Sequence, residues 1–148
     1  MNFWLCIDQN RMDGLGEYEY SGTRETVDRG FNISHGLEPM KLNVFEYVIE
    51  DIISTMFYGM YDYLCVSYMP KREDGVEAIQ TARPQIDEKH NSEIVIADEN
   101  SECGFRIYNK KDMTVKETIK LFREVLVEYK RPDLTGWEDV TEIVNYIE

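Results

Sequence analysis

The sequence predicts an α+β domain, in which one mostly antiparallel sheet is covered on one face by two long amphipathic helices, with a short C-terminal helix. Three observations support this prediction. Short apolar runs rich in β-branched and aromatic residues recur along the chain, as in strands. Two longer segments repeat apolar residues at steps of three and four, as in helices that bury one face. The two kinds of segment do not alternate regularly, so a doubly wound parallel sheet is not expected.

The first part of the chain contains three expected strands. Residues 3–7 are apolar and predict a buried strand, and residues 17–20 alternate acidic and aromatic side chains, as in a half-exposed strand. Residues 31–33 predict a short edge strand before a Ser-His-Gly turn.

The first helix is expected to begin at Asn43, with Glu46 placed to complete a capping box. Its apolar stripe runs from Phe45 to Met60, and Gly59 weakens its end. The width of this stripe indicates a helix that packs against a sheet.

The middle of the chain predicts four more strands. Residues 64–69 and 76–82 each form an apolar, strand-like run that ends near a proline. Residues 85–92 are polar and predict an exposed loop. Residues 93–97 and 104–108 then predict a hairpin around an acidic turn.

The last part of the chain is expected to be helical. Thr114 and Glu117 form a capping-box pattern, and the apolar stripe that follows runs to Tyr129, before Pro132. Residues 137–147 predict the short C-terminal helix. The length of 148 residues fits one domain, and we expect residues 1–148 to form a single acidic domain.

The net charge is the most prominent feature of the composition. The chain has 29 acidic and 16 basic residues, for a net charge of −13. Such a chain repels phosphate backbones and anionic lipid surfaces, so neither direct nucleic-acid binding nor membrane binding is expected. Two interpretations of the charge stay open, which are solubility alone and steered association with a basic protein.

The expected location is the cytoplasm. The N-terminal residues lack a basic segment followed by a long apolar run, so no signal peptide is predicted, and no apolar stretch approaches the ~18–20 residues that span a bilayer. Cys6, Cys65 and Cys103 are far apart and form no Cys-x-x-Cys motif, so neither a disulfide framework nor a zinc site is expected.

No catalytic or cofactor motif is present. The two histidines, His35 and His90, lie in polar segments, and we expect both to be exposed loop residues. An enzyme that uses either imidazole as a general base at a site without a motif stays an alternative. The segment 98–104 has oxygen-bearing residues like a calcium loop, but its glycine comes one position late and the twelfth position is Asn109, so no metal is expected.

The acidic residues suggest the leading hypothesis, a bacterial-type protein-binding inhibitor without enzymatic activity. Such a protein would be an immunity protein that neutralises a basic, nuclease-type toxin, or a nucleic-acid-mimicking antagonist, and it would act by occlusion. A self-associating regulatory subunit stays a second alternative, and the sequence leaves the oligomeric state open. The candidate partner-binding residues are seven carboxylates and two aromatic anchors: Asp98, Glu99, Glu102, Asp133, Glu138, Asp139, Glu142, Trp137 and Tyr61.

Overall fold

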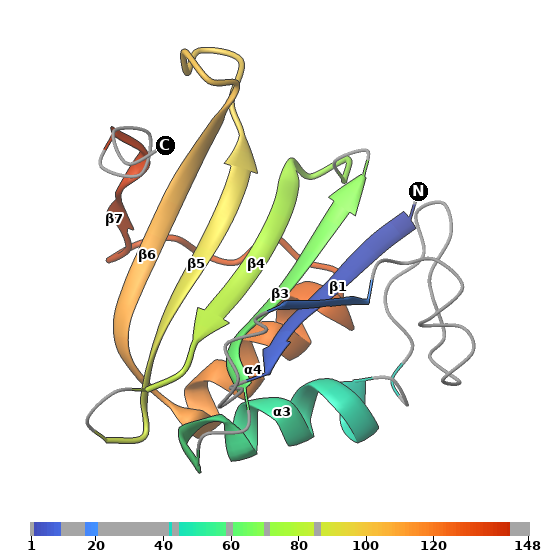
Figure 1. The fold of residues 1–148 in the computed structure, drawn as a ribbon. Helices are drawn as coiled ribbons and strands as arrows, with labels where there is room; N and C mark the ends of the chain where they lie inside the picture. The colour runs from blue at the N-terminus through green and yellow to red at the C-terminus, as the bar shows by residue number, and fades with distance from the viewer. Residues whose placement is uncertain are drawn as a thin grey trace.

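A computed structural model describes residues 2–9, 17–20, 42, 45–58, 61–69, 72–84 and 87–142. Its main feature is a seven-stranded sheet with the strand order β2-β1-β3-β4-β5-β6-β7 (Figure 1). Every neighbouring pair is antiparallel, which confirms the predicted α+β class and antiparallel sheet. The strands are β1 (Asn2–Gln9), β2 (Glu17–Tyr20), β3 (Tyr61–Met69), β4 (Val76–Ala82), β5 (Lys89–Ala97), β6 (Phe105–Thr114) and β7 (Glu138–Asp139).

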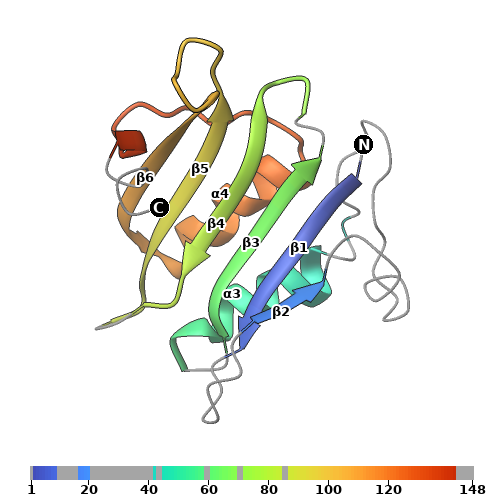
Figure 2. The same ribbon diagram turned by 45° about the horizontal axis from the view of Figure 1, so that its top comes forward.

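Two helices, α3 (Glu50–Thr55) and α4 (Val115–Leu126), cover one face of the sheet, and both lie behind it in Figure 2. Their apolar sides meet the buried side chains of β3, β4 and β5 in a continuous core. Burial of apolar surface stabilises the folded state by roughly 25 cal/mol per Å². This layer therefore supplies the main driving force for folding. The opposite face, here called the open face, carries the alternate side chains of the same strands.

The prediction of two long helices is wrong for the first one. The segment consists of a π-helical turn (Phe45–Ile49), the six-residue α3 and a 3₁₀ turn (Met56–Tyr58). Five residues of its predicted apolar stripe are nonetheless buried, because π, α and 3₁₀ turns all return a side chain to the same side after three to five residues: Phe45, Ile49, Ile52, Ile53 and Met56. The spacing of the apolar residues therefore predicted which side of the segment is buried, but not the type of helix that it forms. The predicted cap at Asn43 lies outside the described residues.

Helix α4 begins where the sequence predicts. The Thr114 hydroxyl accepts a hydrogen bond from the Glu117 amide at 3.1 Å, and the Glu117 carboxylate accepts one from the Thr114 amide at 3.0 Å, which completes the capping box. The helix ends at Leu126, before the predicted Tyr129. Tyr129 has φ of 59°, in the left-handed region that ends a helix.

The predicted C-terminal helix begins later than the sequence predicts, because only Thr141 and Glu142 of residues 137–142 are helical. Glu138–Asp139 form β7 and pair with β6. The Val140 amide donates to the Ile107 carbonyl at 2.8 Å, and the Thr141 hydroxyl accepts from the Ile107 amide at 2.8 Å. Pairing with β6 thus replaces helix at Glu138 and Asp139 and delays the start of helical structure to Thr141. Residues 143–148 lie outside the described chain.

The predicted loop at residues 85–92 is half strand, because β5 begins at Lys89. Alternate burial of His90, Ser92 and Ile94 explains the error, since two of these buried residues are polar and give no apolar signal. The other strands of the prediction are confirmed except for residues 31–33, which lie outside the described residues. Among the helices that the structure describes, none has the length and apolarity needed to cross a bilayer.

Candidate protein-binding site

The turn between β5 and β6 projects from one end of the sheet and carries three of the predicted carboxylates, Asp98, Glu99 and Glu102. The Asp98 amide donates to the Gly104 carbonyl at 2.9 Å, which closes the turn. Gly104 has φ of +85°, a conformation that glycine adopts without strain. The tip is therefore held by its own backbone and leaves the carboxylates of Glu99 and Glu102 exposed.

A single arginine joins this tip to the C-terminal segment. Arg106 donates from Nε to Asp98 Oδ2 at 2.9 Å and from Nη1 to Asp139 Oδ2 at 2.8 Å. Asp98 and Asp139 are 41 positions apart in the printed sequence, yet each contacts the same guanidinium. The structure thus brings together two acidic segments that the sequence analysis treated separately.

We call this region the acidic corner and define it by six carboxylate residues around Arg106: Asp98, Glu99, Glu102, Glu138, Asp139 and Glu142. Arg106 offsets only part of their charge. Glu99, Glu102, Glu138 and Glu142 are exposed and form no ion pair within the described part of the chain. Unpaired carboxylates keep their full field toward solvent and are available to a basic surface.

The two bridged carboxylates are held in the ionised form. The Asn100 amide and the Arg106 guanidinium donate to Asp98 and lower its pKa. Partial burial acts to raise the pKa of Asp139, but the hydroxyl and amide of Thr141 and the guanidinium of Arg106 outweigh it, so the pKa is lowered. Hydrogen bonds to the charged form are thus what keep the corner negative at neutral pH.

The other three predicted residues lie elsewhere. Asp133 and Trp137 line a groove of about 260 Å³ beside α4, together with Lys110 and Lys120. Asp133 accepts from the amide and hydroxyl of Thr135, and Trp137 is partly buried against the core. Tyr61 is also partly buried. It begins β3, whereas the hairpin tip follows the end of β5, a strand that runs in the same direction, so Tyr61 lies at the opposite end of the sheet.

Sequence reasoning missed Arg106, the residue that organises the corner. Arg106 lies directly across from Ile96, a core residue, but in the sequence it stands between the apolar Phe105 and Ile107, at the ordinary polar position of an alternating strand. The alternation of the strand therefore gives no signal that distinguishes this arginine. The contact of Arg106 with Asp139 was not expected, because residues 137–147 were predicted to form a helix.

The expectation of an exposed loop histidine is wrong for His90. The imidazole has 0% exposure, and its Nδ1 lies 3.1 Å from the Thr81 hydroxyl, which in turn accepts from Ser92 at 3.2 Å. Burial lowers the pKa of His90, with smaller opposing effects from the Ala82 carbonyl and from Glu88. The neutral imidazole is part of a buried polar cluster on the helix-covered side of β5. His35 lies outside the described residues.

The calcium-like spacing at residues 98–104 has a structural explanation. One Asp98 carboxylate oxygen accepts from the Asn100 amide and the other from Arg106, so both are already occupied by hydrogen-bond donors. Over the ranges that the structure describes, no three His, Cys, Asp or Glu side chains are grouped to hold a metal ion.

Comparison with known proteins yields no relative: no family model, no curated protein and no solved structure matches the chain.

Proposed function

We propose that the chain is an acidic protein-binding inhibitor that occludes the active surface of a basic partner, such as a nuclease-type toxin for which it serves as the immunity protein in a bacterial cytoplasm. The observation that carries the proposal is the acidic corner, where two acidic segments distant in sequence meet around one arginine. Direct nucleic-acid or membrane binding forms no part of the proposal, because the same field repels both.

The carboxylates of the corner would occupy the positions that a basic protein reserves for phosphates. Steered association of this kind raises the association rate above the neutral value of about 10⁵–10⁶ M⁻¹s⁻¹ and makes it fall with ionic strength. A stable complex of standard size buries roughly 1,200–2,000 Å², so the contact extends past the corner itself.

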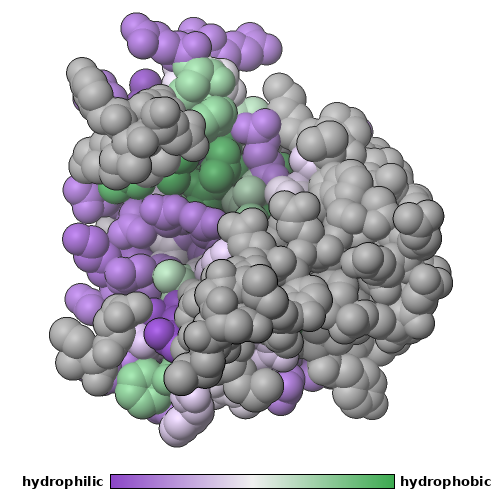
Figure 3. Space-filling view, viewed as in Figure 1, coloured by the Kyte–Doolittle hydropathy of each residue, from purple (hydrophilic) through white to green (hydrophobic). Residues whose placement is uncertain are grey.

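Apolar side chains next to the corner supply the second part of the contact. Figure 3 shows hydrophilic residues at the hairpin tip and a hydrophobic patch directly below it. Val95 and Phe105 lie beside the tip and are only half-buried. Their neighbours Ile94 and Ile96 are in the core, so alternation directs Val95 to the open face. These residues replace Trp137 and Tyr61 as the proposed anchors.

The test is capture of a partner by the immobilised chain at low and high salt, followed by identification of the captured protein and assay of its activity. We expect a basic protein whose enzymatic activity is blocked when the chain is added. A variant that removes four negative charges from the acidic corner should lose capture: Glu99→Gln, Glu102→Gln, Glu138→Gln and Glu142→Gln.

A matched variant removes the same charge elsewhere and should retain capture: Asp51→Asn, Glu73→Gln, Glu124→Gln and Glu128→Gln. Equal loss in both variants would show that only net charge matters and would contradict a role for the corner. Failure to capture any basic protein at either ionic strength, together with a salt-insensitive dimer in light scattering, would refute the inhibitor proposal in favour of self-association.

A further inference from the structure

Two of the three cysteines occupy facing positions in the sheet. Cys6 on β1 and Cys65 on β3 are 59 positions apart in the printed sequence, yet they are direct partners in the antiparallel register of these strands. The two strands lie side by side in Figure 2. The register of this pair shifts only between Asp8 and Gln9, so the irregularity does not reach the cysteines. The fold therefore brings together two thiol-bearing residues that are distant in sequence.

The spacing of facing positions suits a disulfide bond. The Cα atoms of directly opposed residues in an antiparallel pair are about 4.5 or 5.5 Å apart, depending on the hydrogen-bond pattern. Both values fall within the range of about 4.4–6.8 Å that a disulfide allows between its Cα atoms. The Cβ atoms of facing residues are about 4.5–5.5 Å apart, whereas a disulfide holds them at about 3.8 Å. A bond across such a pair can form but is strained, and strain makes a disulfide easier to reduce.

Cys65 lies on the open face of the sheet. Its neighbours on β3, Leu64 and Val66, have 0% exposure and belong to the core. Strand alternation therefore places Cys65 on the opposite face, where it is half-buried and not enclosed by the helices.

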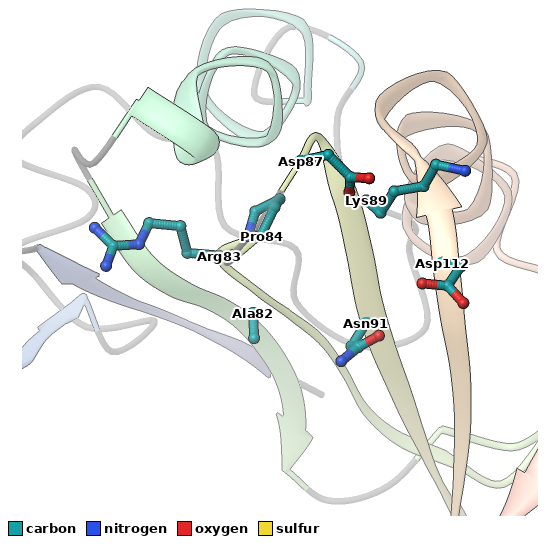
Figure 4. A pocket seen from close by; sticks show the side chains of 7 residues that line it. All are labelled: Ala82, Arg83, Pro84, Asp87, Lys89, Asn91 and Asp112. Atoms are coloured by element: carbon teal, nitrogen blue, oxygen red, sulfur yellow. The ribbon is translucent and has the colours of Figure 1, made fainter.

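Two hollows bring solvent to this part of the open face. The first has a volume of about 410 Å³ and is lined by Tyr63 and Gln80, among others. Gln80 is the direct partner of Cys65 on β4, and Tyr63 is two residues before Cys65 on β3. Ala82 and Asn91 line both this hollow and a second one of about 480 Å³, where Figure 4 shows them. A small oxidant or reductant in water therefore reaches the sheet next to Cys65.

Cys103 is not placed to react with Cys65 in the same chain. It lies in the turn between β5 and β6, and β4 separates that hairpin from β3. Two strand spacings of about 4.8 Å put β5 about 10 Å from β3. Residues whose Cα atoms are more than about 7 Å apart cannot be bridged by a disulfide without movement of the backbone. Cys103 therefore serves as a control thiol.

We propose that Cys6 and Cys65 form a reversible disulfide that locks β1 onto β3 under oxidising conditions. A peroxide oxidises one thiol to a sulfenic acid and is itself reduced to water. The second thiol then attacks the sulfenic sulfur, the S–S bond forms, and the hydroxyl group leaves with the proton as a second water. Two molecules of an added thiol reverse the step and are themselves joined as a disulfide.

The lock acts at the junction between two parts of the sheet. In the strand order, β2 and β1 are joined to the other five strands through the pairing of β1 with β3. A covalent bond across that pairing prevents the two strands from separating, so local opening there becomes rarer. The site is remote from the acidic corner and does not depend on the inhibitor proposal.

The test uses the full chain with Cys103→Ser, which leaves only the two facing thiols. Hydrogen peroxide is added, remaining thiols are alkylated, and unreduced peptides are mapped by mass spectrometry. We expect a crosslink within one chain between the peptides that contain Cys6 and Cys65, and an intact mass lower by two hydrogens. Glutathione should reverse both changes. Hydrogen exchange at the amides of β1 and β3 should be slower in the crosslinked chain than in the reduced one.

A matched variant keeps two thiols on the open face but moves one of them along β3: Cys65→Ser with Ser67→Cys, also in the Cys103→Ser chain. Diagonal positions are about 7–8 Å apart, so its crosslink should form at least about tenfold more slowly. Equal rates in the two chains, or a rate in urea equal to that of the folded chain, would show that the register does not direct the bond and would overturn the proposal. Crosslinks only between chains, or oxidation that stops at the sulfenic or sulfinic acid, would also overturn it.

Discussion

The guanidinium of Arg72 donates a 2.6 Å hydrogen bond from Nη1 to the carbonyl of Val125, in the last turn of α4. Arg72 is only 1% exposed, and its Nη2 donates to Asp74 at 2.7 Å. The guanidinium carbon lies 3.7 Å from the ring centroid of Tyr129 and 5.0 Å from that of Tyr68. One side chain from the β3–β4 connection thus satisfies a terminal helix carbonyl and fixes the helix against the sheet.

Replacement of Arg72 by Met should therefore destabilise the fold by about 3 kcal/mol, because it leaves the Val125 carbonyl and Asp74 without their donor. Urea unfolding followed by circular dichroism measures this change. Lys116→Met, on the exposed side of α4, is the matched control and should change the free energy of unfolding by less than about 0.5 kcal/mol. Equal unfolding midpoints for the two variants would show that Arg72 does not hold α4.

Arg72 also shows why the sequence predicts some features and not others. The start of α4 depends on Thr114 and Glu117, which are three residues apart, and the sequence predicted it correctly. The end of α4 coincides with a hydrogen bond from a residue 53 positions away, and the sequence predicted a longer helix. Local signals of capping and alternation identify elements, whereas contacts between distant residues decide where several of them stop.

The same distinction applies to the acidic corner. The two acidic segments were visible as clusters in the sequence, but the sequence left open whether they form one surface. Their meeting depends on the pairing of β7 with β6 and on Arg106, neither of which follows from local spacing. Trp137 and Tyr61 were expected beside the clusters, but both are partly buried against the core, as aromatic side chains next to a core commonly are.

His90 should make stability depend on pH. Its pKa is lowered from the ordinary value of 6.5 by burial, so the folded state keeps the imidazole neutral while the unfolded state protonates it below about pH 6.5. Its contribution is complete above that pH and is lost as the pH falls toward the lower folded pKa. His90→Gln removes this titration, so the difference in unfolding free energy between the parent and this variant should change between about pH 7 and 5. A constant difference would contradict the lowered pKa.

Thr114 should contribute measurably through its cap. Thr114→Ala removes the acceptor for the Glu117 amide and should cost about 1 kcal/mol in the free energy of unfolding. Lys116→Ala, an exposed change in the same turn, introduces the best helix former and should not destabilise the protein. A loss of stability in the second variant equal to that in the first would assign the effect to the turn in general and not to the cap.

Thr141 positions the C-terminal half of the acidic corner. Its buried hydroxyl accepts from the Ile107 amide and donates to Asp139, so it joins β7 to both β6 and Arg106. Thr141→Val keeps the shape but leaves a buried amide without an acceptor, which should cost about 1–3 kcal/mol. We expect faster hydrogen exchange at the amides of Ile107 and Val140, and weaker capture of the basic partner because Glu138 and Asp139 are no longer held beside the hairpin tip.

Thr135→Val, whose exposed hydroxyl contacts only Asp133 among the described residues, is the control and should change neither measurement. If exchange becomes faster while capture is unaffected, β7 is needed for the fold but not for binding, and the hairpin tip alone forms the contact.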